Sequence, residues 1–283
     1  MKTWMYYNHA LLPATPPNAE PDFSELQKKS TWKPDGNRAL LARWTTDFDC
    51  GYETSWWHCI KDSAFDINTA KAKIRYYIKK GVENFEVKVL DACDYKEELY
   101  KVQVAAFSAY PKSYRPNVDK ESFLTGISEW KEKYIVFGAF EKTDGTLQGY
   151  SLCGEHDGFV QFLVQKTNPA YEKLQINAAL VNGILEHYDK RLSKDFYIVD
   201  GERNIMHETA FQGYLERYFG FRKAYCKLHI KYRRGVGIVV KMLYPFRKWI
   251  AKINIKGAKQ IFGVLKMEEI SRISNKKAGR LCK

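Results

Sequence analysis

The sequence predicts a mixed α/β (α+β) fold with a mainly antiparallel central sheet, an N-terminal strand pair and a basic C-terminal helical tail. Apolar residues alternate along Tyr134 to Glu141, Leu147 to Cys153 and Phe159 to Gln165. Asp144-Gly145 and Asp157-Gly158 between these segments are typical of hairpin turns. The segments on both sides show helical spacing. With 283 residues, 45% hydrophobic and 28% charged, the chain is neither globally disordered nor a polytopic membrane protein.

The excess positive charge lies in the C-terminal part of the chain. Residues 231–283 hold 15 Lys and Arg but 2 Asp and Glu, whereas the first 230 residues hold 31 of each sign. A nucleic-acid enzyme usually spreads basic residues over its body, so DNA is not an expected partner. A terminal basic block is typical of docking to an anionic partner, and phospholipid and RNA are the two candidates.

Cysteine spacing and the absence of long apolar segments predict a cytoplasmic protein. The six cysteines form no C-x-x-C pair, which argues against a zinc ribbon or a disulfide framework, and we expect no metal site. The first nine residues lack an apolar segment, and no stretch reaches the roughly 18 apolar residues of a membrane span.

The N-terminal third is predicted to hold irregular structure, two strands and one helix. Residues 11–37 contain five prolines and few apolar residues, which indicates a surface loop or extended arm. Two aromatic strands follow at Ala39 to Thr45 and Ser55 to Lys61. Asn68 is the expected N-cap of a helix that ends before Gly81.

The rest of the body alternates between strands and helices. A strand at Phe85 to Val89 precedes a helix with an Asp94/Glu97 capping box, and Asp119 begins a second helix before the three-strand meander. Asn168-Pro169 then breaks the chain. The elements expected after it are a helix from Leu174 to Tyr188, a strand from Phe196 to Val199, a helix from His207 to Phe219 and a strand from Ala224 to Lys231. From Phe85 onward the predicted order is β-α-α-β-β-β-α-β-α-β.

This order resembles the GNAT acyltransferase fold, and three segments look like its Fem-type aminoacyltransferase branch. These segments are Trp57 to Asp62 with the basic helix Lys71 to Gly81, the turn Val199 to Asn204, and the helix Phe211 to Phe221 with its terminal F-G-F. Residues Arg43 to Glu53 resemble proteins of bacterial surface-polysaccharide gene clusters. The resemblance implies acyl or aminoacyl transfer in cell-envelope synthesis.

The resemblance also implies a domain division and a co-substrate. We expect a Pro-rich arm at 1–38, a partial N-terminal subdomain at 39–81, a GNAT-like domain at 82–232 and a basic amphipathic tail at 233–283. GNAT enzymes hold the coenzyme A pyrophosphate on a glycine-rich turn at a helix N-terminus, but Asn168 to Asn177 contain no glycine. Coenzyme A is therefore not expected to bind in the standard manner. Fem-type enzymes also lack this turn and resemble users of aminoacyl-tRNA, so the expected co-substrate is acyl-CoA or aminoacyl-tRNA, with no tightly bound cofactor.

Candidate catalytic residues follow the strand Phe196 to Val199, because crevices beyond strand ends are where α/β sheets bind ligands. Asp200 is the expected base, Glu202 and Asn204 lie beside it in sequence, and Asn204 or nearby amides would polarise the acyl carbonyl. His207 at a helix start is a second candidate base. The alternative is that Asp200 caps a turn before Gly201 and that His207 is a surface residue.

Candidate substrate-binding residues lie in two basic or aromatic segments and in the turn. Tyr110, Tyr114 and Arg115 belong to a proline-stiffened loop suited to stacking on sugars and holding phosphates, and Arg203 is a further anion ligand. Lys71 and Arg75 can bind phosphate, or they form a solvated helix face. Asp47-Phe48-Asp49 matches the D-x-D motif of glycosyltransferases, which is a weak signal at this length.

The tail combines apolar and basic residues in the manner of an interfacial helix. From Pro245, a helix would place Phe246 and Trp249 on one side, with Arg247, Lys248 and Lys252 around the rest. Gly237 to Leu243 is alternatively the last strand of the sheet.

The sequence supports three hypotheses. The first is an acyl- or aminoacyltransferase, peripheral at the inner face of the plasma membrane, acting on an amino group of a glycan or peptide precursor, lipid-linked or nucleotide-linked. Its partners would be that precursor, anionic lipid and tRNA. The second is a non-catalytic module that recruits polysaccharide machinery, and the third is a D-x-D glycosyltransferase.

Overall fold

The computed structural model describes residues 3–112, 115–205 and 210–281, and the chain forms two compact units. Unit 1 comprises segments within Met1–Cys59, Glu202–Ala210 and Lys223–Lys283, and unit 2 comprises Ile60–Gly201 and Phe211–Arg222. The boundaries fall inside strands, since β4 (Trp56–Lys61), β9 (Tyr197–Glu202) and β10 (Arg222–Tyr232) each begin in one unit and end in the other.

Unit 2 contains the predicted mixed sheet. Its strands are β5 (Phe85–Leu90), β6 (Ile135–Glu141), β7 (Leu147–His156), β8 (Phe159–Thr167) and β9. Neighbours from β5 to β8 pair antiparallel, and β8 pairs with β9 in parallel. Gly145 and Gly158 have φ of 72° and 81°, so the two predicted hairpin turns are confirmed.

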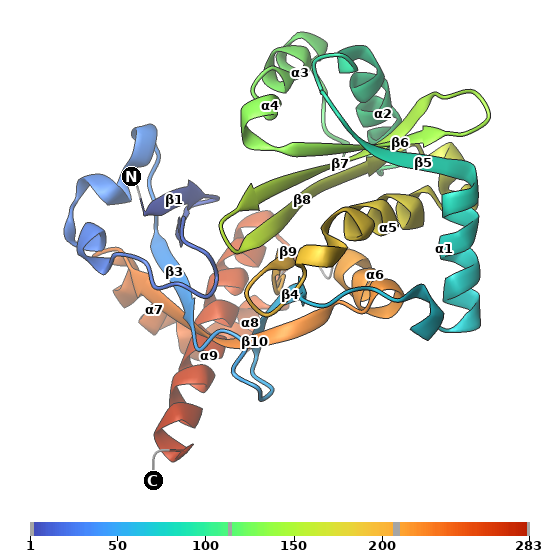
Figure 1. The fold of residues 1–283 in the computed structure, drawn as a ribbon. Coiled ribbons are helices and arrows are strands. Elements are labelled where there is room, and N and C mark those ends of the chain that lie inside the picture. The colour runs from blue at the N-terminus through green and yellow to red at the C-terminus, as the bar shows by residue number, and fades with distance from the viewer. Residues whose placement is uncertain (1–2, 113–114, 206–209, 282–283) are drawn as a thin grey trace. The chain divides into compact units, whose positions relative to one another are not determined.

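Helices cover both faces of this sheet. They are α1 (Ala72–Asn84), α2 (Lys96–Ser108), α3 (Lys120–Ile127), α4 (Trp130–Lys133), α5 (Ile176–Tyr188) and α6 (Ala210–Phe219). Among the described residues, the short 3-10 turns η4 (Ile67–Thr69), η6 (Pro169–Leu174) and η7 (Asp189–Arg191) accompany them. Figure 1 shows α2, α3 and α4 on one side of β5–β8 and α5 on the other. The element order predicted from Phe85 onward is confirmed, except that α4 is an additional short helix before β6.

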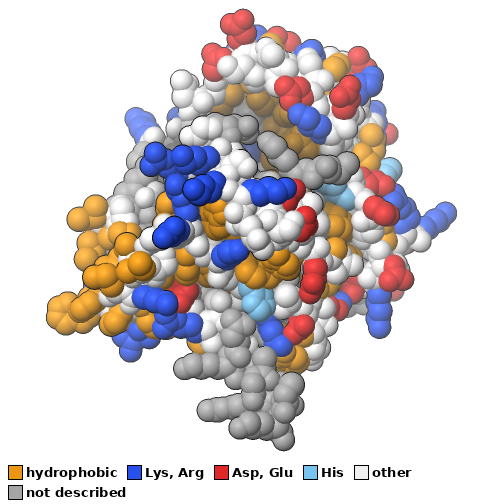
Figure 2. Space-filling view, turned by 90° about the vertical axis from the view of Figure 1, so that its left-hand side faces the viewer, with side chains coloured by type: hydrophobic (Ala, Val, Ile, Leu, Met, Phe, Trp, Pro, Cys, Tyr) orange, Lys and Arg blue, Asp and Glu red, His pale blue; other side chains and the backbone are white. Residues whose placement is uncertain are grey.

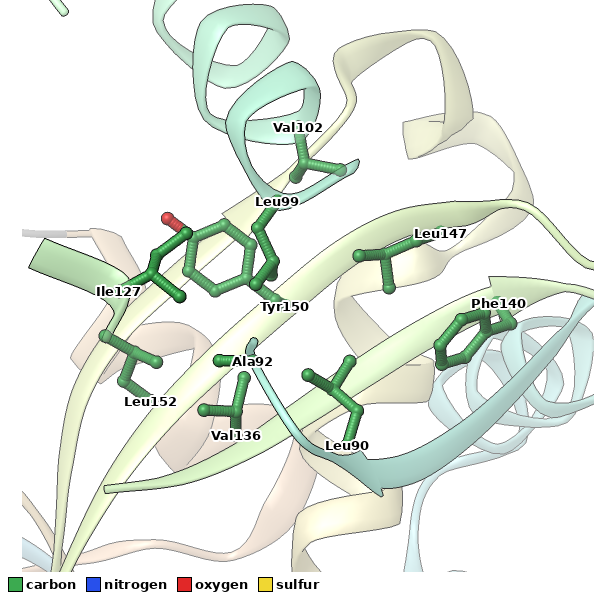
Figure 3. Packing of buried hydrophobic residues seen from close by; sticks show 10 residues of the cluster. All are labelled: Leu90, Ala92, Leu99, Val102, Ile127, Val136, Phe140, Leu147, Tyr150 and Leu152. Carbon is green, nitrogen blue, oxygen red and sulfur yellow. The ribbon is translucent and has the colours of Figure 1, made fainter. Parts of the chain in front are cut away.

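The core between α2, α3 and the sheet is a single cluster of buried side chains (Figure 3). It consists of Leu90, Ala92, Leu99, Val102, Ile127, Val136, Phe140, Leu147, Tyr150 and Leu152. Tyr150, the polar member, donates its hydroxyl to Gln103 Oε1 at 2.6 Å, so its burial leaves no orphaned group. This core fixes β7, the strand on which β8 is aligned.

Two predicted helix boundaries differ from the structure. Helix α1 begins after Lys71, not after Asn68, and it continues through Gly81. Gly81 does not end the helix. Its missing side chain lets α1 approach α5 closely. Helix α2 has Tyr95 as N-cap with no side-chain cap, so the Asp94/Glu97 capping box is wrong. By contrast, Asp119 accepts from the Ser122 backbone N–H at 2.8 Å, as an N-cap does.

Unit 1 contains the N-terminal strands and most of β10. Strands β1 (Trp4–Tyr7) and β2 (Ala10–Pro13) form a hairpin, β2 pairs in parallel with β3 (Leu41–Thr46), and β3 pairs antiparallel with β10. The proline-rich stretch is not a surface loop. It forms η1 (Phe23–Gln27), η2 (Ser30–Trp32) and η3 (Pro34–Gly36), and its Leu26 and Trp32 are buried against Trp4 and Leu11. These few large side chains suffice for a small core.

The tail of unit 1 is helical throughout most of its length. Its elements are α7 (Val236–Leu243), η8 (Tyr244–Phe246), α8 (Arg247–Ile250) and α9 (Lys256–Leu281). The alternative strand at Gly237 to Leu243 is therefore wrong, and the predicted helix from Pro245 is divided into η8 and α8 because proline opens a short 3-10 turn there. Within the described residues, no helix is long and apolar enough to cross a membrane.

Candidate active site

The two parallel strands of unit 2 separate partway along their length. Strand β8 pairs with β9 at Phe159, Val160 and Gln161, and within the described residues this pairing ends at Gln161 and Val199. Strand β8 then continues to Thr167 on β7, while β9 continues past Val199. An opening between parallel strands at their carboxyl ends is the usual ligand crevice of an α/β sheet.

Asp200 is the first residue of β9 after the strands separate. Its carboxylate is partly buried and accepts a hydrogen bond from the Gln212 side chain of α6. Burial raises the pKa of Asp200 to about 7, because desolvation outweighs the opposing effect of the Gln212 hydrogen bond. A carboxylate with this pKa can accept a proton near neutral pH.

Helix α6 contacts both strands of the opening. Its Gln212 bonds to Asp200 on β9, and its Phe211 ring lies 5.5 Å from the ring of Phe162 on β8. Gln212 lies in the family-like segment Phe211 to Phe221, but it is not among the site residues predicted from the sequence. Because a hydrogen-bond partner brought from a later helix has no local signal, only the tertiary structure reveals it.

A β-bulge lies on β8 just after Gln161, the last residue of β8 that pairs with β9. Leu152 pairs with Val164 and Cys153 with Phe162, so Leu163 is the extra residue in the ladder with β7. A bulge leaves its extra residue outside the regular hydrogen-bond pattern and is frequent beside active sites. Three consecutive apolar residues, Phe162 to Val164, interrupt the strand's alternation, which is the signal that could have identified the bulge from sequence.

The carboxyl half of β8 is held by a polar network rather than by β9. Gln165 Nε2 donates to Asn177 Oδ1 at 2.8 Å, and the hydroxyl of Thr167 donates to the same oxygen at 3.3 Å. Ser151 on β7 donates to Gln165 Oε1 at 3.2 Å. These bonds tie β8 to the first turn of α5.

The N-terminus of α5 differs from a glycine-rich phosphate site. Asn168 caps η6, which leads directly into Gln175 with φ of 65° and then into α5. Helix α1 packs closely here, since a Cβ added at Gly81 would meet Gln175 O at 2.7 Å and Ala179 N at 2.9 Å. The first turn of α5 is therefore packed against α1.

We expect Gly81→Ala to lower the free energy of unfolding by roughly 1–3 kcal/mol, because the added methyl would force α1 away from the α5 backbone. Urea denaturation measures this change. Gly126→Ala on α3 is the matched control, since nothing lies within 4 Å of its added Cβ, and it should stabilise by up to about 1 kcal/mol. Equal stability of the Gly81 variant and the wild type would contradict the close packing.

Two other predicted residues of unit 2, Arg115 and Arg75, make hydrogen bonds to backbone atoms near them in sequence. Arg115 donates to the backbone oxygens of Ser108 and Tyr110 at 2.5 Å and 3.2 Å, and the Tyr110 hydroxyl lies 3.5 Å from Lys166 Nζ of β8. Arg75 donates to Asn68 O at 3.1 Å and therefore braces the turn before α1. Lys71 is exposed at the start of that helix. Tyr114 and His207 lie outside the described residues.

Glu202, Arg203 and Asn204 belong to unit 1. Glu202 Oε2 lies 2.9 Å from Arg43 NH2, and its Oε1 lies 3.8 Å from Nε2 of buried His58. Burial lowers the pKa of His58, so the charged partner of Glu202 at neutral pH is Arg43. Asn204 is exposed.

Arg203 and the D-x-D motif also make contacts within unit 1. Arg203 donates to Ser55 O at 2.7 Å, and its guanidinium lies 4.6 Å from the centre of the Trp57 ring. Asp47 pairs with Lys227 at 2.5 Å. The part of the chain that the structure describes contains no group of three His, Cys, Asp or Glu that could hold a metal.

A separate pocket of about 440 Å³ lies in unit 2 between α1 and α5. Phe65, Ile67, Leu185 and acidic side chains line it, and none of the residues predicted from the sequence does. We assign the candidate site to the strand opening instead, because the partly buried Asp200 carboxylate lies where β8 and β9 separate, which is the usual ligand crevice of an α/β sheet.

Comparisons with known proteins find solved structures that match at low sequence identity. No protein-family model matches the sequence, and no curated protein matches it significantly. A putative lysylphosphatidylglycerol synthetase C-terminal domain from Agrobacterium fabrum shares 10% identity over 84% of this chain and 82% of that chain, with a TM-score of 0.49. FemX shares 5% over 66% and 63%, with a TM-score of 0.47.

A smaller acetyltransferase also matches part of the chain. The PaiA N-acetyltransferase from Thermoplasma acidophilum, solved in complex with coenzyme A, shares 19% identity over 38% of this chain and 74% of that chain, with a TM-score of 0.30. Because these identities are low, no activity is inferred from the matches.

Proposed function

We propose that this protein is a GNAT-type acyltransferase that transfers an acyl or aminoacyl group to an amino group. The observation that carries the proposal is the Asp200 carboxylate, which lies where β8 and β9 separate and whose pKa burial raises to about 7. Amide formation from an ammonium substrate requires a base for its protons, and this carboxylate is suited to that role.

In the proposed reaction the acceptor amine attacks the acyl carbonyl carbon. A new C–N bond forms, the bond to the thiol or tRNA oxygen breaks, and the leaving group departs as thiolate or alkoxide that is then protonated. Asp200 takes a proton from the nitrogen, and Gln212 orients the carboxylate. The backbone N–H of Leu163 is the proposed donor to the carbonyl oxygen, because the bulge takes this residue out of the ladder.

The finer assignments extend this proposal. The acceptor would be a cell-envelope glycan or peptide precursor at the inner membrane face, contacted by the loop that carries Tyr110 and Arg115. The donor would be acyl-CoA or aminoacyl-tRNA, and the close contact of Gly81 with the α5 N-terminus favours a donor that does not place a pyrophosphate there.

The close contact of Gly81 with the α5 N-terminus also favours a second candidate function, a non-catalytic module with this fold. Thermal unfolding with acetyl-CoA, with aminoacyl-tRNA and with buffer alone separates the candidates. A donor present at 100 times its Kd should stabilise the protein by roughly 2.7 kcal/mol. Stabilisation by either donor, with release of free thiol or tRNA when amines are added, supports the enzyme. No stabilisation and no release would support the module.

A further inference from the structure

The tail of unit 1 exposes an apolar surface that the rest of the unit does not cover. Ile238 and Met242 of α7 are 65% and 68% exposed, and Trp249 of α8 is 79% exposed. Val239 and Phe246 are also more than half exposed. We name these five residues, together with Lys241, Lys248 and Lys252, the α7–α8 face.

Helix α7 is apolar on two sides, and only one of them is buried. Val240 is buried, whereas Ile238, Val239 and Met242 face water. A helix that is apolar all round is normally covered on all sides. Figure 2 shows hydrophobic side chains gathered toward one edge of the molecular face, with Lys and Arg side chains close by. Exposed apolar patches of this kind mark interaction surfaces.

One cation of the tail is paired with a carboxylate, whereas three others are exposed to water. Arg247, which the sequence analysis assigned to membrane contact, lies 3.0 Å from Glu269 and 4.3 Å from the Tyr244 ring centre, so it anchors α8 to α9. Lys241, Lys248 and Lys252 are exposed and pair with no acidic group among the described residues. Among the described residues of unit 1, no acidic side chain neutralises the charge of these three lysines.

Residues 236–255, which include α7, η8 and α8, contain four Lys and Arg and no Asp or Glu. Anionic lipid fits this composition because headgroups attract the cations while Trp, Phe, Met and Ile enter the acyl boundary. A protein partner fits less well, since lysine is depleted from protein interfaces. RNA would use the cations but would leave Met242 and Ile238 exposed.

We propose that the α7–α8 face docks on the surface of an anionic lipid bilayer. The proposal deepens the membrane-face part of the proposed function, and its test uses no substrate, so the two can fail separately. Docking places α7, η8 and α8 against the headgroups, with Trp249 and Met242 inserted and Lys248 and Lys252 on lipid phosphates.

The test is flotation of the full chain with vesicles of phosphatidylcholine alone and of phosphatidylcholine mixed with phosphatidylglycerol. Binding to the anionic vesicles alone is expected. Lys248→Gln with Lys252→Gln should weaken it about 25-fold, at roughly fivefold per cation. Met242→Ser with Trp249→Ala should weaken it about tenfold or more, from lost apolar burial.

The matched control lies on α2 of unit 2. Val104 is 42% exposed and Lys101 is exposed, so Val104→Ser with Lys101→Gln removes one exposed apolar side chain and one exposed cation elsewhere and should leave binding unchanged. Thermal unfolding establishes that each variant is folded. Equal binding to both vesicle types, or equal binding by the α7–α8 variants and the wild type, would overturn the proposal.

A second measurement locates Trp249 directly. Brominated lipid should quench tryptophan fluorescence of the wild type more strongly than that of Trp249→Phe. Equal quenching, or RNA binding that needs Lys248 and Lys252 without any vesicle binding, would also overturn the proposal.

Discussion

Asp200→Asn is expected to lower turnover roughly 100- to 10,000-fold, because the amide cannot accept the proton released from the acceptor amine. In the wild type, kcat/KM should rise with pH through about 7, the pKa to which burial raises Asp200. Asp195→Asn, at an exposed position before β9, is the matched control and should retain activity. Unchanged turnover in the Asp200 variant would remove this residue from the mechanism.

Asp200→Asn is expected to raise the free energy of unfolding, although it lowers turnover. A buried carboxyl whose pKa is raised holds its proton in the folded state between about pH 4 and pH 7, so its contribution to stability falls as pH rises through that window. Asp200→Asn removes this penalty. Relative to the wild type, the variant should gain roughly 2 kcal/mol between pH 5 and pH 8. Urea denaturation at both pH values measures the gain, and a gain that is independent of pH would contradict the raised pKa.

Glu202→Ala is expected to lower the free energy of unfolding by roughly 2–4 kcal/mol, because it leaves Arg43 without its carboxylate in a poorly solvated place. The Arg43 side chain is 19% exposed and its guanidinium lies 5.5 Å from the Trp56 ring centre. Denaturation of the single variants and of Glu202→Leu with Arg43→Met measures the effect. The double variant should recover most of the loss, since apolar residues can replace a buried ion pair.

This experiment also tests the sequence-based role of Glu202. A structural role predicts that folded Glu202→Ala keeps its turnover at permissive temperature. Lost turnover with unchanged stability would instead support Glu202 as a catalytic group, as the sequence predicted.

The sequence by itself determined the order of elements in unit 2. Period-two alternation with Asp-Gly turns specifies hairpins locally, and Asp119 caps its helix through a neighbour three residues away. The place of Asp200 at the end of the apolar run Phe196 to Val199 was also predictable, although β9 continues through Asp200 to Glu202. These features depend on residues that are close together in the chain, so the local sequence pattern is sufficient to predict them.

Only the tertiary structure decided features that depend on distant partners. The raised pKa of Asp200 comes from burial near Gln212, and the length of α1 comes from the contact of Gly81 with α5. Trp32 is buried because Trp4 and Leu11 lie beside it, although its own segment reads as a loop. Arg247 and Lys248 are adjacent and equally basic, but Arg247 pairs with Glu269 whereas Lys248 is exposed to water. Residues distant in the sequence determine how deeply each side chain is buried and whether its charge is paired. Local periodicity does not show which distant residue lies beside a given side chain, so these features require the tertiary structure.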